Sequence, residues 1–433
     1  MQIIKHPAIE TWNNLLKRPV FDSGLIREKV HPILEDVKKN GDEAVKKYTR
    51  QFDGFIPESL MVTEKEMEGI DHAFDELLRD AIHLAVNNIT KFHQAQRREV
   101  LKIETWFGVT CWRKQIPIEK VGLYIPGGTA PLFSSLLMLG IPAMIAGCKE
   151  IILCTPPDKD GKIHPAIMYS AHILGLEKIY KIGGAQAIAA MAYGTETVPK
   201  VDKIFGPGNQ FVTAAKQIVT LDGVAIDMPA GPSEVAVIAD DSADPEFLVW
   251  DLLSQAEHGT DSQVLLISDS EKIINSVNEA VTKHLKNLPR KSIAAGALKN
   301  SKLIITDSVE IAMDICNHYA PEHLIINTVN ADEIATKVIN AGSVFIGPYT
   351  PESAGDYASG TNHTLPTNGY ARSYSGVSLD SFMKQVTFQK IDPHGIGEIG
   401  WAIEEMAKAE SLTAHKNAVT VRLDAIRKEK LND

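Results

Sequence analysis

The chain has 433 residues, with 44 Lys and Arg against 55 Asp and Glu, so its formal net charge is -11. This balance argues against a nucleic-acid or membrane-surface binder, because phosphate groups call for a basic protein face. Apolar residues make up 44% and charged residues 23% of the chain, which is typical of a globular protein with a large core. At roughly 150 residues per domain, the length predicts two to four domains.

The cysteines do not form a recognisable scaffold or metal site. No two of them make a C-x-x-C pair, so we expect neither a disulfide framework nor a thiolate zinc site nor a thioredoxin-like motif. The first residues, MQIIKHPAIETWNNLLKRP, lack the apolar stretch of a secretion signal. These features predict a cytoplasmic protein. The four cysteines are Cys111, Cys148, Cys154 and Cys316.

Residues 1–110 show mainly helical periodicity, with apolar residues three and four apart in 28–52 and 68–96. The stretch 121–148 carries no charge and is long enough to span a bilayer. Its prolines and glycines divide it, however, into a short strand, a turn and a helix. We therefore expect a buried strand–turn–helix there and no membrane span.

From residue 121 onward, short apolar runs alternate with helical patterns. This rhythm predicts parallel sheets covered by helices on both faces. The pattern restarts after about residue 230, which predicts two Rossmann-like α/β domains sharing a cleft. The runs predicted as strands are VGLYIP, EIILCTPP, KIYKIG, KIFGP and VAIDMP in the first series, and EVAVIAD, SQVLLIS, KLIIT, HLIIN and SVFIG in the second.

The predicted domain boundaries follow these two series. An N-terminal arm covers 1–25, a discontinuous first α/β domain covers 26–120 and 237–375, and a second α/β domain covers 121–236. Strands are expected to stop at about residue 375. The remaining segment, 376–433, is predicted as a helical arm that is too small to hold a core and so packs on another domain or subunit.

Glycine motifs suggest a nucleotide site in the second α/β domain. A literal G-x-G-x-x-G lies at 395–400, but no strand with a ribose-binding acid follows it, so we interpret it as a chance match. Three other glycine turns, at 124–129, 183–186 and 206–209, each follow a predicted strand and open a helix. Each turn alone is explained by a tight β-to-α connection. Taken together, at the ends of successive strands, the three turns fit a phosphate or dinucleotide site as well as they fit three tight connections.

Polar residues give weaker signals when taken one at a time. Gln255 and His258 share a helix face, and with Asp356 and His415 they offer nitrogen and oxygen ligands, although their spacing matches no recognised metal motif. The pair Glu322–His323 precedes an apolar strand and is suited to general acid–base chemistry. The alternative is that Glu322 and His323 are ordinary polar residues of a surface loop. His363 and Glu410 are open to the same two interpretations. Cys148 and Cys154 are interpreted as core thiols.

Taken together, these segments resemble the histidinol dehydrogenase family from about residue 20 to 428. The resemblance implies a homodimeric zinc enzyme of histidine biosynthesis, which oxidises L-histidinol to L-histidine through the aldehyde with two NAD+. The matching segments occur in order as VGLYIPGGTAPLFSSLLMLGIPAMIAGC, GGAQAIAAMAYGTETVPKVDKIFGPGNQFVT, IDMPAGPSEV, DLLSQAEHGTDSQV, PEHLI, TPESAGDYASGTNH and LTAHKNAV.

The resemblance also implies a role for individual residues. Zinc ligands would be Gln255, His258, Asp356 and, supplied by the other subunit, His415. Catalysis would fall to Glu322 and His323. The substrate would contact Ser233, His363 and Glu410 as well as His323 and the zinc ligands. NAD would contact Tyr124, Gln186 and Asn209, one in each of the three glycine turns.

Two alternatives stay open beside this interpretation. One is a related dehydrogenase that acts on another polar alcohol, such as a sulfonated diol. Ser233, Asp356, His363, Glu410 and His415 all follow the histidinol pattern, which disfavours it. The other is a non-catalytic nucleotide-binding or metal-storage protein, which would have no reason to keep Glu322 and His323. The stretch 391–403 departs from the family pattern and is expected to affect only the packing of the C-terminal arm.

Overall fold

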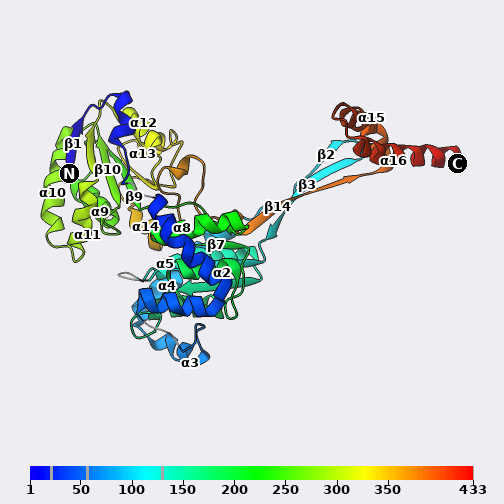
Figure 1. Cartoon of the computed structure of the whole chain (residues 1–433). Coiled ribbons are helices and arrows are strands. Elements are labelled where there is room, and N and C mark those ends of the chain that lie inside the picture. The colour runs from blue at the N-terminus through cyan, green and yellow to red at the C-terminus, as the bar shows by residue number, and fades with distance from the viewer. Residues whose placement is uncertain (20–22, 55–57, 128–130, 433) are drawn as a thin grey trace. The chain divides into compact units, whose positions relative to one another are not determined.

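The computed structural model describes residues 1–19, 23–54, 58–127 and 131–432 (Figure 1). Residues 128 and 129 of the first predicted glycine turn lie outside this part. The chain forms two compact units. We call residues 1–96 and 118–382 the body, and residues 97–117 and 383–433 the arm.

One parallel sheet of the body, sheet A, is built from the second predicted series of strands plus the N-terminus. The strand at its edge, β1, pairs with β11, although 300 positions separate Gln2 from its partner Lys302. All its strand pairs are parallel. In spatial order the strands are β1 (Gln2–Lys5), β11 (Lys302–Ile305), β10 (Gln263–Ser268), β9 (Glu234–Ala239), β12 (His323–Asn327) and β13 (Ser343–Ile346).

Sheet A is buried on both faces, which explains its uninterrupted apolar strands. Alternate residues of β9 pack into different cores: Val235 and Val237 belong to one, Ala236 and Ile238 to the other. The helices that contribute to these cores are α1 (Trp12–Leu15), α9 (Pro245–Ala256), α10 (Glu271–Leu285), α11 (Lys291–Lys299), α12 (Val309–Tyr319) and α13 (Ala331–Ala335). A further helix, α14 (Glu352–Tyr357), follows β13 and contacts α9.

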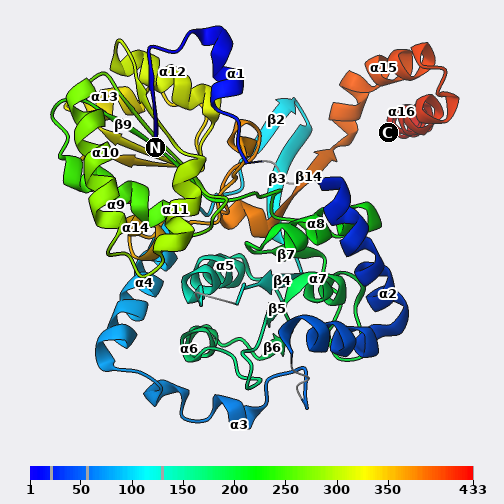
Figure 2. The same cartoon turned by 60° about the vertical axis from the view of Figure 1, so that its left-hand side comes forward.

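The other parallel sheet, sheet B, contains the first predicted series. Its strands, in spatial order, are β6 (Lys178–Lys181), β5 (Glu150–Thr155), β4 (Lys120–Tyr124), β7 (Lys203–Phe205) and β8 (Ala225–Ile226). Figure 2 shows α5 and α6 on one side of this sheet and α2, α7 and α8 on the other. The helices around sheet B are α2 (Ser23–Asp53), α3 (Glu64–Met67), α4 (Glu76–Gln94), α5 (Phe133–Ala146), α6 (Pro165–Ile173), α7 (Gly184–Tyr193) and α8 (Gln210–Val219).

Both sheets follow the same winding. Numbered along the chain, each has the strand order 3-2-1-4-5, with β1 added outside sheet A. This is the order of dinucleotide-binding α/β folds, in which ligands bind where the winding reverses. In sheet B that point lies between β4 and β7. The two predicted parallel-sheet units are therefore confirmed.

The arm contains an antiparallel sheet and a helical hairpin. Its strands are β14 (Met383–Ile391), β3 (Val109–Pro117) and β2 (Lys102–Trp106), and its helices are α15 (Pro393–Ala409) and α16 (Thr413–Asn432). The expectation that strands stop at about residue 375 was therefore wrong. The sequence hides β14 because all nine of its residues are exposed or half-buried, so no apolar face marks the strand.

Two further segments differ from the prediction. Helices α2 and α4, expected with the first α/β domain, pack instead on α5, α7 and α8 of sheet B. Residues 102–117, expected there as well, form β2 and β3 of the arm, where β3 lies between β14 and β2 and pairs with both. Among the described residues, no helix combines the length and apolar character that crossing a membrane would need.

Candidate active site

A cavity of about 710 Å³ lies in the body. Part of its wall comes from the amino ends of β9 and β12 in sheet A, and part from the loop that follows the carboxyl end of β7 in sheet B. Most of the residues predicted from the sequence to act in the site line this one cavity: Asn209, Ser233, Gln255, His258, Glu322, His323, Asp356 and His363.

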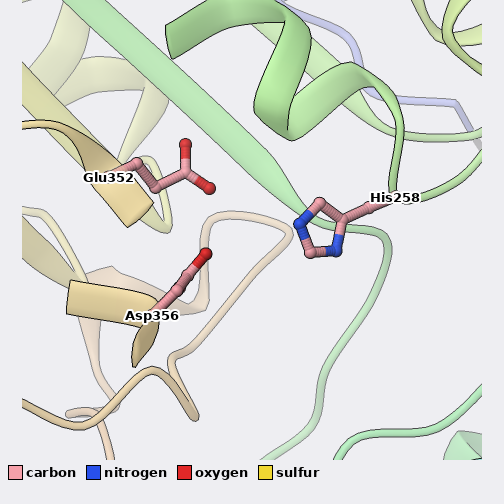
Figure 3. Close-up of side chains that lie close together, drawn as sticks. All are labelled: His258, Glu352 and Asp356. Atoms are coloured by element: carbon pink, nitrogen blue, oxygen red, sulfur yellow. The ribbon is translucent and has the colours of Figure 1, made fainter. Parts of the chain in front are cut away.

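Three side chains in the cavity converge in the manner of a metal site. Glu352 and Asp356 are one turn apart on α14, so both face the same way, and His258 follows the end of α9 (Figure 3). One donor atom from each lies within 4.8 Å of the others. One imidazole nitrogen and two carboxylate oxygens make a donor set that suits zinc and related divalent ions.

Gln255, one turn before His258 on α9, is buried beside this cluster. In one orientation of its terminal amide, the nitrogen donates to Glu352 and the oxygen accepts from the backbone N–H of Glu234 at 2.8 Å. In the other orientation, the oxygen faces the Glu352 carboxylate and lacks a donor. A cation bound between these two oxygens would satisfy both of them, so the second orientation suits a metal ligand.

His323 begins strand β12 and is almost completely buried. Its Nδ1 lies 3.1 Å from the carbonyl oxygen of Glu234. A carbonyl only accepts, so Nδ1 carries the proton and Nε2 of the neutral ring has a free lone pair. Nε2 has no hydrogen-bond partner among the described residues and lies 3.9 Å from Asp356 Oδ1. Burial lowers the pKa of His323 to about 4, so the ring is a neutral base at pH 7.

Glu322, the residue before His323, is also buried. Its Oε2 accepts from the backbone N–H of Glu234 at 2.9 Å. Burial raises the pKa of Glu322 well above its usual value, and the nearby carboxylates of Glu234 and Asp356 add to the effect. A raised pKa makes this carboxylate a stronger base than an exposed glutamate, which suits proton transfer from water.

His363 is held at both ring nitrogens. Nδ1 lies 2.9 Å from the backbone oxygen of Asp356 and therefore donates to it. Nε2 lies 2.9 Å from Ser135 Oγ on α5 and accepts from it. Burial lowers the pKa of His363. The ring is thus a neutral, oriented imidazole in the wall of the cavity.

The three predicted nucleotide contacts lie where sheet B meets its following helices. The hydroxyl of Tyr124, at the end of β4, accepts from the N–H of Gly184 at 3.1 Å. Gln186 is fully buried, and neither polar atom of its amide has a partner in the described part of the chain. Asn209 caps α8 by accepting from two backbone N–H groups. Gly206 has φ +125°, and a Cβ there would lie 2.0 Å from the Tyr124 carbonyl oxygen, so only glycine fits.

The remaining two predicted site residues lie in the arm. Glu410 ends α15, and His415 lies in the first turn of α16. Both side chains are exposed. Their roles in binding zinc and substrate stay predictions.

Sequence reasoning missed Glu352, Glu234, Ser135 and Arg18. Glu352 had a usable signal, because it stands four residues before Asp356, as on one helix face. The small and polar residues of ESAGDYASG indicated a loop instead. The other three are brought in by long-range packing: Arg18 forms an ion pair with Glu234 across 216 positions, and nothing local in the sequence marks that contact.

The fold and the cavity define an α/β protein with dinucleotide-type sheets, an acid–histidine cluster suited to a metal ion, and a buried Glu–His pair suited to proton transfer. Comparison with known proteins narrows this class. The chain matches the histidinol dehydrogenase family over residues 16–423. It therefore belongs to the histidinol dehydrogenase family, whose members are oxidoreductases of histidine biosynthesis.

Individual relatives match over nearly the full length. A histidinol dehydrogenase from Bacteroides thetaiotaomicron is 60% identical over 427 residues, covering 99% of this chain and 100% of the relative. One from Aliivibrio fischeri is 51% identical and covers 96% of this chain and 94% of the relative. The crystal structure of a histidinol dehydrogenase from Elizabethkingia anophelis superimposes with a TM-score of 0.96 at 55% identity, covering 99% of each chain.

Proposed function

We propose that this protein oxidises L-histidinol to L-histidine through L-histidinaldehyde, using two NAD+ and a bound zinc ion. The observation that carries the proposal is the bare Nε2 of His323. It is a buried, neutral base, and it faces the cluster that contains Asp356. A substrate hydroxyl placed there would meet a proton acceptor with no competing partner.

The residues present fit a zinc ion. Gln255, His258 and Asp356 offer one nitrogen and two oxygens, and His415 of a second subunit would supply another nitrogen, as the family pattern implies. Glu352, beside Gln255, adds a further carboxyl group. When bound, zinc would hold the imidazole and amine nitrogens of the substrate and so fix the position of its carbinol group.

The residues at sheet B fit a dinucleotide. The strand order reverses between β4 and β7, where Tyr124 and the Gly206 turn meet. The unpartnered amide of Gln186 offers a donor and an acceptor at the start of α7. NAD+ would accept the hydride in each oxidation.

In the first oxidation, His323 Nε2 takes the proton of the substrate hydroxyl while the hydride leaves the same carbon. The products are the aldehyde and one NADH. The Nδ1 bond to the Glu234 carbonyl keeps Nε2 aimed at the hydroxyl throughout. The resulting imidazolium is stabilised by the nearby Asp356 carboxylate.

In the second oxidation, Glu322 takes a proton from water, and the water oxygen bonds to the aldehyde carbon. The hydrate then loses a hydride from that carbon, which gives the carboxylate and a second NADH. Over the whole reaction one alcohol, one water and two NAD+ give one carboxylate, two NADH and three protons. No thioester is needed. Of the cysteines, Cys154 and Cys316 are fully buried, and burial raises the pKa of the Cys148 thiol to about 12.

A homodimer is part of this proposal, because His415 and Glu410 are expected to complete a partner's site. The arm offers a surface for such packing. Several large apolar side chains there are more than half exposed and would be covered by such packing. They include Leu101, Ile103, Trp106, Phe107, Trp401, Met406 and Val421.

The test is to measure NADH formed per L-histidinol consumed by the purified protein, before chelation, after chelation and after zinc is returned. The proposal predicts two NADH per histidinol, loss of activity with the metal and recovery with zinc. Zinc-loaded, dimeric protein that leaves histidinol untouched would contradict it. That result would favour the alternative of a related dehydrogenase for another polar alcohol.

A further inference from the structure

One residue touches both predicted catalytic side chains through its backbone. Glu234 is the first residue of β9, which runs beside β12. Its N–H donates to Glu322 Oε2 at 2.9 Å, and its carbonyl oxygen accepts from His323 Nδ1 at 3.1 Å. The position of Glu234 therefore sets where the Glu322 carboxylate lies and which ring nitrogen of His323 is unprotonated.

The side chain of Glu234 is itself fixed by Arg18. The guanidinium binds both carboxylate oxygens, with Nη2 2.8 Å from Oε2. The backbone N–H of Asn368 also donates to this carboxylate, at 2.7 Å. The Glu234 side chain is 3% exposed and that of Arg18 14%. A bidentate ion pair of this kind fixes the orientation of the Glu234 carboxylate as well as balancing its charge. A lysine in place of Arg18 would balance the charge without fixing the orientation.

Arg18 also holds the turn that leads into the catalytic pair. Its Nη2 donates to the backbone oxygens of Tyr319 at 2.8 Å and Ala320 at 3.3 Å, and the guanidinium stacks 3.8 Å over the Tyr319 ring. Ala320 has φ +54°, a left-handed conformation that a residue with a Cβ adopts only when its surroundings impose it. Two residues later the chain reaches Glu322.

We infer that Arg18 and Glu234 are positioning residues for Glu322 and His323, an inference that rests on the roles given to that pair in the proposed function. A buried ion pair is by itself a poor source of stability, because desolvation offsets most of the attraction. Here the pair links three separate segments around the two reacting side chains. Its contribution is to the geometry of the proton acceptors.

The test uses Arg18→Lys, Arg18→Ala and Glu234→Gln, with Lys17→Ala as the matched control. Lys17 is the neighbouring cation, and its side chain is exposed. We expect kcat for L-histidinol to fall by ~10²-fold in Arg18→Ala and Glu234→Gln and by less in Arg18→Lys, because small displacements of reacting groups cost that much. Zinc content and KM for NAD+ should stay near the wild-type values. Folded variants with lower melting temperature but wild-type kcat would overturn the inference.

A second readout needs no substrate. In ¹⁵N-histidine-labelled protein, the His323 signal, assigned with His323→Asn, should report a proton on Nδ1 and a bare Nε2. We expect Arg18→Lys and Glu234→Gln to shift this signal towards a mixture of tautomers, while Lys17→Ala leaves it in place. An unchanged signal in both variants would overturn the inference. Should the wild-type protein fail to oxidise histidinol, the proposed function would fall, and this spectrum would still test the positioning.

Discussion

Ser135 Oγ lies 2.9 Å from His363 Nε2 and donates to it, because the Asp356 carbonyl oxygen fixes the ring proton on Nδ1. We predict that Ser135→Ala raises KM for L-histidinol by up to about 10-fold with little change in kcat, since losing one hydrogen bond costs about 1 kcal/mol. Initial rates at varied histidinol measure both constants. Ser134→Ala is the control, because the neighbouring hydroxyl is not bonded to His363. An equal effect of both variants would count against the contact.

Glu322→Gln separates the two oxidations. The amide keeps the size of the side chain but cannot take a proton from water, so we expect oxidation of histidinaldehyde to fall by at least ~10²-fold. Oxidation of histidinol to the aldehyde should fall far less. The two half-reactions are followed separately, with histidinol and with histidinaldehyde as starting substrates. Equal losses in both would refute this division of roles.

Glu352 is predicted to strengthen metal binding through its place beside Gln255, His258 and Asp356. We expect Glu352→Gln to weaken zinc affinity by about 10- to 100-fold, as loss of a ligand's supporting carboxylate does in other zinc sites. Competition with a chromogenic chelator measures the affinity. Glu333→Gln, an exposed change on α13, should leave it unaltered. Retention of full affinity in Glu352→Gln would contradict the prediction.

Within the G-x-G-x-x-G stretch, Gly395 is predicted to act in packing and Gly397 is not. A Cβ on Gly395 would lie 2.5 Å from the backbone oxygen of Gly108, whereas one on Gly397 would meet nothing within 4 Å. Gly395→Ala should destabilise α15 by about 1–3 kcal/mol, and Gly397→Ala should stabilise it by up to about 1 kcal/mol. Hydrogen exchange of α15 amides measures both. Similar effects of the two changes on stability would contradict the packing role of Gly395, and a raised KM for NAD+ in either variant would restore a nucleotide role.

Asp53 makes stability depend on pH. It ends α2, Oδ2 has no partner in the described part of the chain, and burial raises its pKa to about 6. The folded state therefore holds a proton that the unfolded chain releases near pH 4. The free energy of unfolding falls as pH rises through this window, and the full penalty applies above pH 6. After allowance for partial exposure, Asp53→Asn should gain about 1 kcal/mol at pH 7.5 and nothing at pH 4. Urea titrations at both pH values test this, and an equal gain at both would contradict it.

Much of the body could be predicted from the sequence, because its strands are buried on both faces. Continuous apolar runs such as VLLIS and HLIIN can hardly form anything else between helical patterns, and all ten predicted runs form strands. The arm was harder for the opposite reason. Its strand β14 is largely exposed, so no apolar periodicity distinguishes it from a loop.

The candidate site was predicted unevenly for a similar reason. Segments such as SQAEH and PEH contain their functional residues within a few positions of one another. The family resemblance then assigned these separate segments to one site. Glu234 and Arg18 act through contacts that join distant parts of the chain, and Ser135 does so from the first turn of an apolar helix. Such contacts exist only in the folded chain, so no local pattern indicates them.

The place of β1 at the edge of sheet A has a consequence for biosynthesis of the protein. Its partner β11 is made 300 residues later, which at 5–20 residues per second is about 15–60 s after β1 leaves the ribosome. Over this interval β1 lacks its partner strand, and Arg18 lacks its ion-pair partner until residue 234 has been made. The segment synthesised first is thus among the last to dock, and a nascent chain released between residues 258 and 322 would carry the metal-site helix α9 without the complete catalytic pair.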